Sequence, residues 1–144
     1  MTLNRAKGRM FKSVGWTWNP ICGCSHGCWY CWAATLRKRW GKEFDPEMRE
    51  HFFKDKMPDD GTWIFVGSMG DTFCDDVPDD WIIRLLNFIK SCKSDNQFLL
   101  QTKNPPRFST FCLNSSRSRP PPTRLCAVAT STGNCAIWSR TWTI

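Results

Sequence analysis

The chain has 144 residues and a formal net charge of +7, and 41% of its residues are hydrophobic. This apolar fraction excludes a compositionally disordered chain, and the length suits one domain with its own core. No segment approaches the ~18 consecutive apolar residues of a membrane span. The basic start is followed by no apolar stretch, which excludes a signal peptide. We therefore expect a cytoplasmic protein without a membrane partner.

The first predicted elements are a strand, a helix and a second strand. Residues 15–18 form the first strand, which ends before Asn19 and Pro20 because the residue before a proline avoids the helical region. Residues 30–40 form a helix that ends at Gly41. Residues 63–66 are an unbroken apolar run, which is typical of a buried parallel strand.

The alternation continues in the second half of the chain. Asp79 is a good N-cap for a helix over residues 80–91, whose apolar positions recur at helical spacing. Residues 97–102 form the next strand, residues 107–111 a short helix, and residues 125–129 a candidate fourth strand. Strands that alternate with helices predict an α/β fold with a parallel sheet or barrel.

The charge distribution divides the chain near residue 111. Residues 1–111 carry 16 Lys and Arg against 13 Asp and Glu, whereas residues 112–144 carry four Arg and no acidic residue. The second part also contains a Ser/Arg run and three consecutive prolines, which are typical of linkers. We expect a core over residues 1–111 and an irregular tail over residues 112–144, as in a chain that is truncated or frameshifted after about residue 111.

Cysteines provide the strongest chemical signal. The chain holds nine, an odd number, and four of them lie between Cys22 and Cys31. Cys24, Cys28 and Cys31 have the spacing C-x3-C-x2-C, and thiolates are soft ligands that suit iron–sulfur clusters or zinc. Three thiolates hold three irons of a 4Fe–4S cube and leave the fourth iron open to a substrate or cofactor.

The alternative is a zinc site of four thiolates that includes Cys22. The run lacks the paired, well-separated cysteines of common zinc modules, so we prefer the cluster. We expect His26, between two of the ligands, to be an exposed loop residue, and the other cysteines to be packed or unpaired thiols.

A second motif, Gly67-Ser68-Met69-Gly70-Asp71, follows the predicted strand 63–66. Active sites of parallel barrels are built from such strand ends, although a plain glycine turn is the alternative. Lys103 ends the next strand, where we expect a solvated lysine, and we expect residues 37–39 to be a solvated basic helix face. We expect most of the nine tryptophans to pack in the core.

These motifs together resemble the radical S-adenosylmethionine superfamily. Within it, residues 14–111 are similar to a phage-borne and archaeal family of radical-SAM-like proteins of unassigned function. The residues that carry the resemblance are Trp16-Thr17-Trp18-Asn19-Pro20, the cysteine loop with an aromatic residue before Cys31, the stretch 65–71, Asp76-Val77-Pro78, Gln101-Thr102-Lys103 and Pro105.

The resemblance implies a partial (β/α) barrel of the radical SAM type with three to four βα units. It implies that Cys24, Cys28 and Cys31 bind a 4Fe–4S cluster whose open iron takes S-adenosylmethionine. Reductive cleavage of that cofactor would release a 5′-deoxyadenosyl radical, which takes a hydrogen atom from a substrate. The resemblance also implies an electron donor such as a flavodoxin or ferredoxin.

The residues expected to bind the cofactor are Tyr30, Gly67, Ser68, Met69, Gly70 and Asp71. Related enzymes often have Gly-Gly-Glu at the second motif, where it contacts the amino group of the methionine part, so Asp71 or the Ser68 hydroxyl would take that role here. Catalytic residues, substrate and reaction stay open, and an incomplete barrel leaves enzymatic activity open as well. The alternatives are a zinc-binding interaction module, which would contact nucleic acid, or a non-functional remnant.

Overall fold

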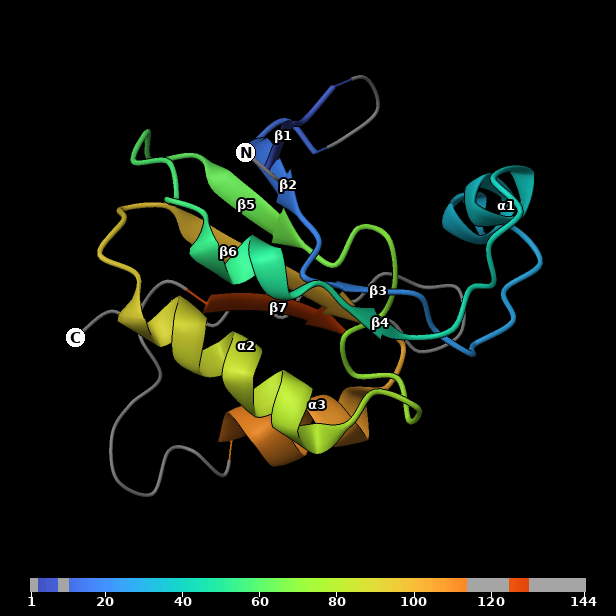
Figure 1. Ribbon diagram of the computed structural model, residues 1–144. Coiled ribbons are helices and arrows are strands. Elements are labelled where there is room, and N and C mark those ends of the chain that lie inside the picture. The colour runs from blue at the N-terminus through green and yellow to red at the C-terminus, as the bar shows by residue number, and fades with distance from the viewer. Residues whose placement is uncertain (1–2, 8–10, 114–124, 130–144) are drawn as a thin grey trace.

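The computed structural model describes residues 3–7, 11–113 and 125–129. Its main feature is a five-stranded sheet with the strand order β1-β2-β5-β6-β7 (Figure 1). The strands are β1 (Asn4–Arg5), β2 (Val14–Trp18), β5 (Trp63–Val66), β6 (Gln97–Thr102) and β7 (Leu125–Ala129). The last four are parallel to one another, and β1 is antiparallel to β2 at the edge. A separate antiparallel pair joins β3 (Ile21–Cys22) to β4 (Glu47–Met48).

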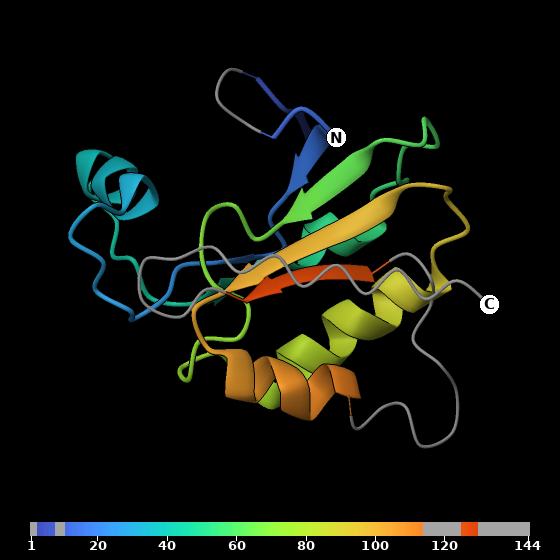
Figure 2. The same cartoon turned by 180° about the vertical axis from the view of Figure 1, so that it is seen from behind.

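Two helices and a helical turn cover one face of this sheet. They are the 3-10 helix η1 (Glu50–Lys54), α2 (Asp79–Ser91) and α3 (Pro105–Leu113). The amphipathic α2 buries Ile82, Leu85, Leu86 and Ile89. Figures 1 and 2 show α2 and α3 side by side on the same side of the sheet.

The core is centred on Trp18, the last residue of β2, which is fully buried. Its ring lies 5.1 Å from that of Phe88 on α2 and 5.9 Å from that of Phe53 on η1, measured between centroids. The indole N–H of Trp18 donates to the carbonyl oxygen of Phe52 at 3.3 Å, so this buried polar group is satisfied. The helices are thereby fixed to the strand that leads into the cysteine loop.

The first helix, α1 (Trp32–Arg39), stands apart from the sheet, beyond the carboxyl ends of the strands (Figure 1). Only Ala33 and Arg37 of this helix are buried. The Arg37 guanidinium donates to the carbonyl oxygen of Glu43 at 3.0 Å and to the Glu47 carboxylate at 3.1 Å. Polar contacts with the following segment, not an apolar face against the sheet, therefore hold α1 in place.

The barrel expected from the resemblance is wrong, although the α/β alternation and the strands 63–66, 97–102 and 125–129 are confirmed. The described sheet is open and mixed: its edge strands are β1 and β7, and they do not pair with each other. The antiparallel β1 occupies the free edge of β2 that barrel closure would require. In addition, α1 has too little apolar surface to cover the sheet as a barrel helix does.

Two local expectations also need correction. Asp79 is the first residue of α2 and not its N-cap, which is Pro78; its carboxylate instead forms an ion pair with Arg107 at 2.5 Å. Strand β7 continues the sheet in parallel register with β6, while residues 114–124 and 130–144 of the expected irregular tail lie outside the described residues. In the part that the structure describes, no helix is long and apolar enough to cross a membrane.

Candidate functional site

A cavity of about 230 Å³ lies at the carboxyl ends of the parallel strands. Crevices at this end of α/β sheets are where ligands commonly bind. Three groups of residues line the cavity: Cys24, His26, Cys28, Tyr30 and Cys31 from the first loop; Gly67, Ser68, Gly70 and Asp71 from the turn after β5; and Gln101, Thr102 and Lys103 from the end of β6. The two motifs and the end of the third predicted strand thus meet at one place.

Close backbone packing joins the cysteine loop to the turn after β5. The N–H of Gly23 donates to the carbonyl oxygen of Met69 at 2.9 Å, and Gly23 forms an isolated parallel bridge with Gly70. A Cβ added at Gly70 would lie 2.5 Å from the Gly23 oxygen, and one added at Gly23 would lie 2.1 Å from the Asp45 oxygen. Gly23 also has a φ of 83°, a left-handed conformation that favours glycine. Both glycines are therefore required for the two motifs to touch.

Each of the three cysteines has a distinct environment. Cys31 is the N-cap of α1, where its Sγ accepts the N–H of Ala34 at 3.4 Å. Cys24 packs against the hydrophobic core, and burial raises the pKa of its thiol to about 11. Cys28 Sγ accepts from Lys103 Nζ at 2.8 Å. Within the described residues, no three His, Cys, Asp or Glu side chains are grouped closely enough to hold a metal ion.

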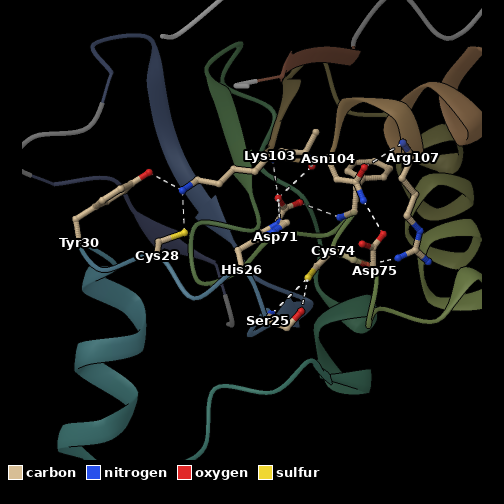
Figure 3. Close-up of polar contacts among 12 residues, drawn as sticks. Ser25, His26, Cys28, Tyr30, Asp71, Cys74, Asp75, Lys103, Asn104 and Arg107 are labelled. Atoms are coloured by element: carbon tan, nitrogen blue, oxygen red, sulfur yellow. Dashed lines mark hydrogen bonds and ion pairs between the residues drawn. The ribbon is translucent and has the colours of Figure 1, made fainter. Parts of the chain in front are cut away.

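The Lys103 side chain reaches from the end of β6 to the cysteine loop (Figure 3) and lines the cavity. Besides Cys28, its ammonium donates to the phenol oxygen of Tyr30 at 2.5 Å and lies 4.5 Å from the centroid of that ring. Two hydrogen bonds raise the pKa of Lys103. The bond to Cys28 has the larger effect, and the bond to Tyr30 has the next largest. Lys103 is exposed, as the sequence predicted, and it makes the contact with Cys28 in addition.

Asp71 is the central polar residue beneath the cavity (Figure 3). Its Oδ2 lies 2.8 Å from His26 Nε2, and accepts the Thr102 hydroxyl at 3.1 Å and the backbone N–H of Lys103 at 2.8 Å. Its Oδ1 accepts the N–H of Phe73 at 2.9 Å. A carboxylate has about four lone-pair positions, so protein groups occupy most of this one. Asp71 thus fastens the cysteine loop, its own turn and the end of β6 together.

His26 is the site residue that the sequence analysis missed, because it predicted an exposed loop histidine. The imidazole is only 21% exposed and contacts Asp71. No local pattern links the two residues, which are 45 positions apart. The only sequence feature that could have indicated a role for His26 in the site is its position between Cys24 and Cys28.

Ser68 and Met69 are held by a buried asparagine. The Oδ1 of Asn19 accepts the Ser68 hydroxyl and the Met69 N–H, both at 3.0 Å. Ser68 lines the cavity, whereas Met69 does not. Asn19, which follows β2, therefore fixes the turn that follows β5.

Two further cysteines lie near the loop but not on the cavity wall. Cys22 is fully buried, its Sγ contacts the carbonyl oxygen of Asn19 at 3.5 Å, and burial raises the pKa of its thiol. The Sγ of Cys74 is also buried, and it contacts the backbone N–H and the hydroxyl of Ser25 at 3.4 and 3.2 Å. Both therefore act as packed thiols in this structure.

Fold and site together define an open α/β protein with a thiol-lined cavity at the carboxyl ends of its parallel strands. A family model described as "Protein of unknown function (DUF5131)" matches residues 11–138, and the chain belongs to that family. The match continues past residue 111, where the sequence predicted the family-like part to end. No curated protein and no solved structure matches the chain.

Proposed function

We propose that this chain is an iron–sulfur protein that holds a 4Fe–4S cluster through Cys24, Cys28 and Cys31. The observation that carries the proposal is that all three cysteines line the same cavity as the turn Gly67–Asp71, although some 40 residues separate the two motifs. A lone cysteine cluster on a surface loop would give no reason for a second, glycine-rich segment to face it.

The residues present fit such a group in their chemistry and in the space around them. Thiolates are the ligands that iron–sulfur clusters use, and each one binds a different iron, so the ligands surround a bulky core. The cavity of about 230 Å³ is many times the ~10–15 Å³ that one water needs on the same measure. Gly67 and Gly70 contribute backbone but no side chain to its wall.

The protein groups around the thiols suit them to ligation. The N–H of Ala34 and the ammonium of Lys103 donate to the sulfurs of Cys31 and Cys28, and such bonds stabilise thiolates and tune a cluster's potential. The high pKa of Cys24 means that its proton must leave when metal binds. When bound, the cluster supplies one-electron chemistry.

We propose further that S-adenosylmethionine occupies the rest of the cavity. Tyr30, Gly67, Ser68 and Gly70 are the residues that we assign to it, because all four line the cavity. We give Met69 and Asp71 a supporting role in which they shape the turn, since protein donors occupy most of the Asp71 carboxylate. Substrate and reaction are left open, and a flavodoxin or ferredoxin is the reductant that the proposal calls for.

A cytoplasmic location belongs to the same proposal. Six cysteines of the described residues are free thiols, and free thiols persist where glutathione and thioredoxin keep a compartment reduced. The competing four-thiolate zinc site would need Cys22 in the cavity, but that side chain is directed into the core. This position of Cys22 favours the three-thiolate cluster.

Substitution of single cysteines tests the proposal. After anaerobic reconstitution with iron and sulfide, Cys24→Ala, Cys28→Ala and Cys31→Ala should each lose bound iron and visible absorbance. Cys92→Ala is the matched control, because Cys92 is a half-buried thiol that does not line the cavity, and it should load like the unmodified chain. If Cys22→Ala abolishes metal binding as fully as the others, a four-thiolate site is the better assignment.

The cofactor part has its own test. S-adenosylmethionine should change the electron paramagnetic resonance spectrum of the reduced cluster, and Ser68→Ala should weaken that change. An unchanged spectrum at saturating cofactor would remove S-adenosylmethionine from the proposal while leaving the cluster in place.

A further inference from the structure

Four large aromatic side chains are exposed on α1 and on the residues that flank it on both sides. Trp29 is 93% exposed, Tyr30 and Trp32 are each 59% exposed, and Trp40 is 57% exposed. We call these four residues, together with Lys38 and Arg39, the aromatic–basic surface. Helix α1, which carries Trp32, Lys38 and Arg39, stands away from the sheet (Figure 1), so a partner can reach this segment. Several exposed indoles on one short segment mark a binding surface more often than a neutral one.

Positively charged residues accompany these aromatic residues on the same segment. Residues 29–42, which contain all four aromatic residues, carry four Lys and Arg and no Asp or Glu. Lys38, Arg39 and Lys42 are exposed. In the part of the chain that the structure describes, none of these three forms an ion pair. The partner of this surface should therefore be an anion.

The combination of indoles and cations favours nucleic acid over an acidic protein as the anionic partner. Protein interfaces concentrate apolar residues in a core that is depleted of charge. Here Trp32 begins the helix, and Lys38 and Arg39 directly precede Trp40 in the chain. Aromatic faces that stack bases, next to cations that contact phosphates, are how proteins bind single strands of nucleic acid. Bases are free to stack in this way only when they are not paired.

We propose that the aromatic–basic surface binds single-stranded nucleic acid. Tyr30 and Trp32 belong to this surface and also line the cavity, so a strand bound there passes the cavity mouth. The proposal goes beyond the cluster and does not require it, because none of the binding groups is a metal ligand. Either DNA or RNA offers the bases and phosphates that the surface recognises.

Fluorescence anisotropy with the full chain tests this proposal. The probes are labelled oligothymidylate and oligouridylate of about 20 nucleotides, which exceeds the site of one small domain. Trp40→Ala should weaken binding by about 5- to 150-fold, since one stacked base contributes about 1–3 kcal/mol. Trp40 is remote from the cysteines, so this variant keeps the loop intact. Trp32→Ala should provide a second, independent loss of affinity. Comparing the two probes shows which nucleic acid is preferred.

Matched variants on another part of the chain provide the controls. Ile83→Ala removes an exposed apolar side chain from α2, and Lys93→Ala removes an exposed cation beyond it; both should bind like the unmodified chain. The double variant Lys38→Ala/Arg39→Ala should reduce the slope of log affinity against log salt concentration by about 1.4, at ~0.7 for each phosphate contact.

Four outcomes would overturn the proposal. They are no binding of either probe at low salt, equal losses in the surface and control variants, tighter binding of a duplex of the same length, and binding of an acidic protein such as a flavodoxin in place of the oligonucleotides. Circular dichroism of each variant establishes that it is folded before its affinity is compared.

Discussion

The ammonium nitrogen of Lys103 lies 2.8 Å from the Sγ of Cys28, although the two residues are 75 positions apart in the chain. The contact joins the end of β6 to the cysteine loop, and both residues line the cavity. A cation that donates to a ligating sulfur disperses negative charge from a cluster. Lys103 is thus placed to set the potential of the metal centre that we propose.

The first prediction concerns this contact. Lys103→Met should make the reduction potential of the reconstituted cluster more negative. The ammonium stabilises the reduced cluster, which carries more negative charge, more than it stabilises the oxidised cluster, so its removal disfavours reduction. Lys103→Arg keeps a cationic donor and should fall closer to the unmodified chain. A redox titration followed by electron paramagnetic resonance measures both, and an unchanged or more positive potential for Lys103→Met would show that the contact does not persist in the loaded protein.

The second prediction concerns the buried carboxylate that joins three segments. Asp71→Ala should lower the free energy of unfolding of the metal-free protein by about 2–4 kcal/mol, because it leaves several buried donors without an acceptor. Urea unfolding measures the loss. The control is Asp75→Ala: Asp75 is exposed and accepts one side-chain bond, from Asn104 at 2.7 Å, so its loss should cost about 0.5–1 kcal/mol. Similar losses in the two variants would contradict the central role assigned to Asp71.

The third prediction is a pH dependence away from the cavity. Asp60 accepts from the hydroxyl and N–H of Thr62, from Trp16 Nε1 and from Asn96 Nδ2, at 2.7–3.1 Å. These bonds, that of the Thr62 hydroxyl first, lower the pKa of Asp60 in the folded state. A carboxyl whose pKa is lower when folded stabilises the protein above its unfolded pKa of about 3.9, and this contribution is lost as pH falls toward the folded value.

Asp60→Asn should therefore lower the melting temperature at neutral pH, and the difference from the unmodified chain should shrink as pH falls below about 4. Differential scanning fluorimetry across this range measures it. Asp59→Asn at the neighbouring position is the control. The two melting temperatures could instead differ by the same amount above and below about pH 4. That result would show that the bonds to the Asp60 carboxylate do not stabilise the fold.

Much of the sheet was predictable because its signals are local. The apolar run Trp63–Val66 and the periodic apolar positions of α2 determine their structures within a few residues, and the cysteine spacing indicates soft ligands without knowledge of the fold. Asn19 and Gly70 show the limit. Both were noticed as parts of motifs, but their roles depend on a contact between loops that each follow a different strand.

Other features could not be predicted because they depend on distant partners. The edge position of β1 and the open sheet result from pairing choices that no strand encodes by itself, which is why the resemblance led to a barrel. Most of the tryptophans were expected to pack in the core, but Trp32 and Trp40 remain exposed because α1 lacks a surface to pack against. Arg37, expected on a solvated face, is buried because Glu43 and Glu47 follow at the right distance.

The central claim is that Cys24, Cys28 and Cys31 hold a cluster, and its most direct test is the metal content of the full chain. After anaerobic reconstitution in the presence of equal iron and zinc, with sulfide added, the protein should be brown. It should contain about four irons and four sulfides per chain, as a 4Fe–4S cube requires. A colourless protein that contains one zinc per chain, or no metal at all, would contradict the claim.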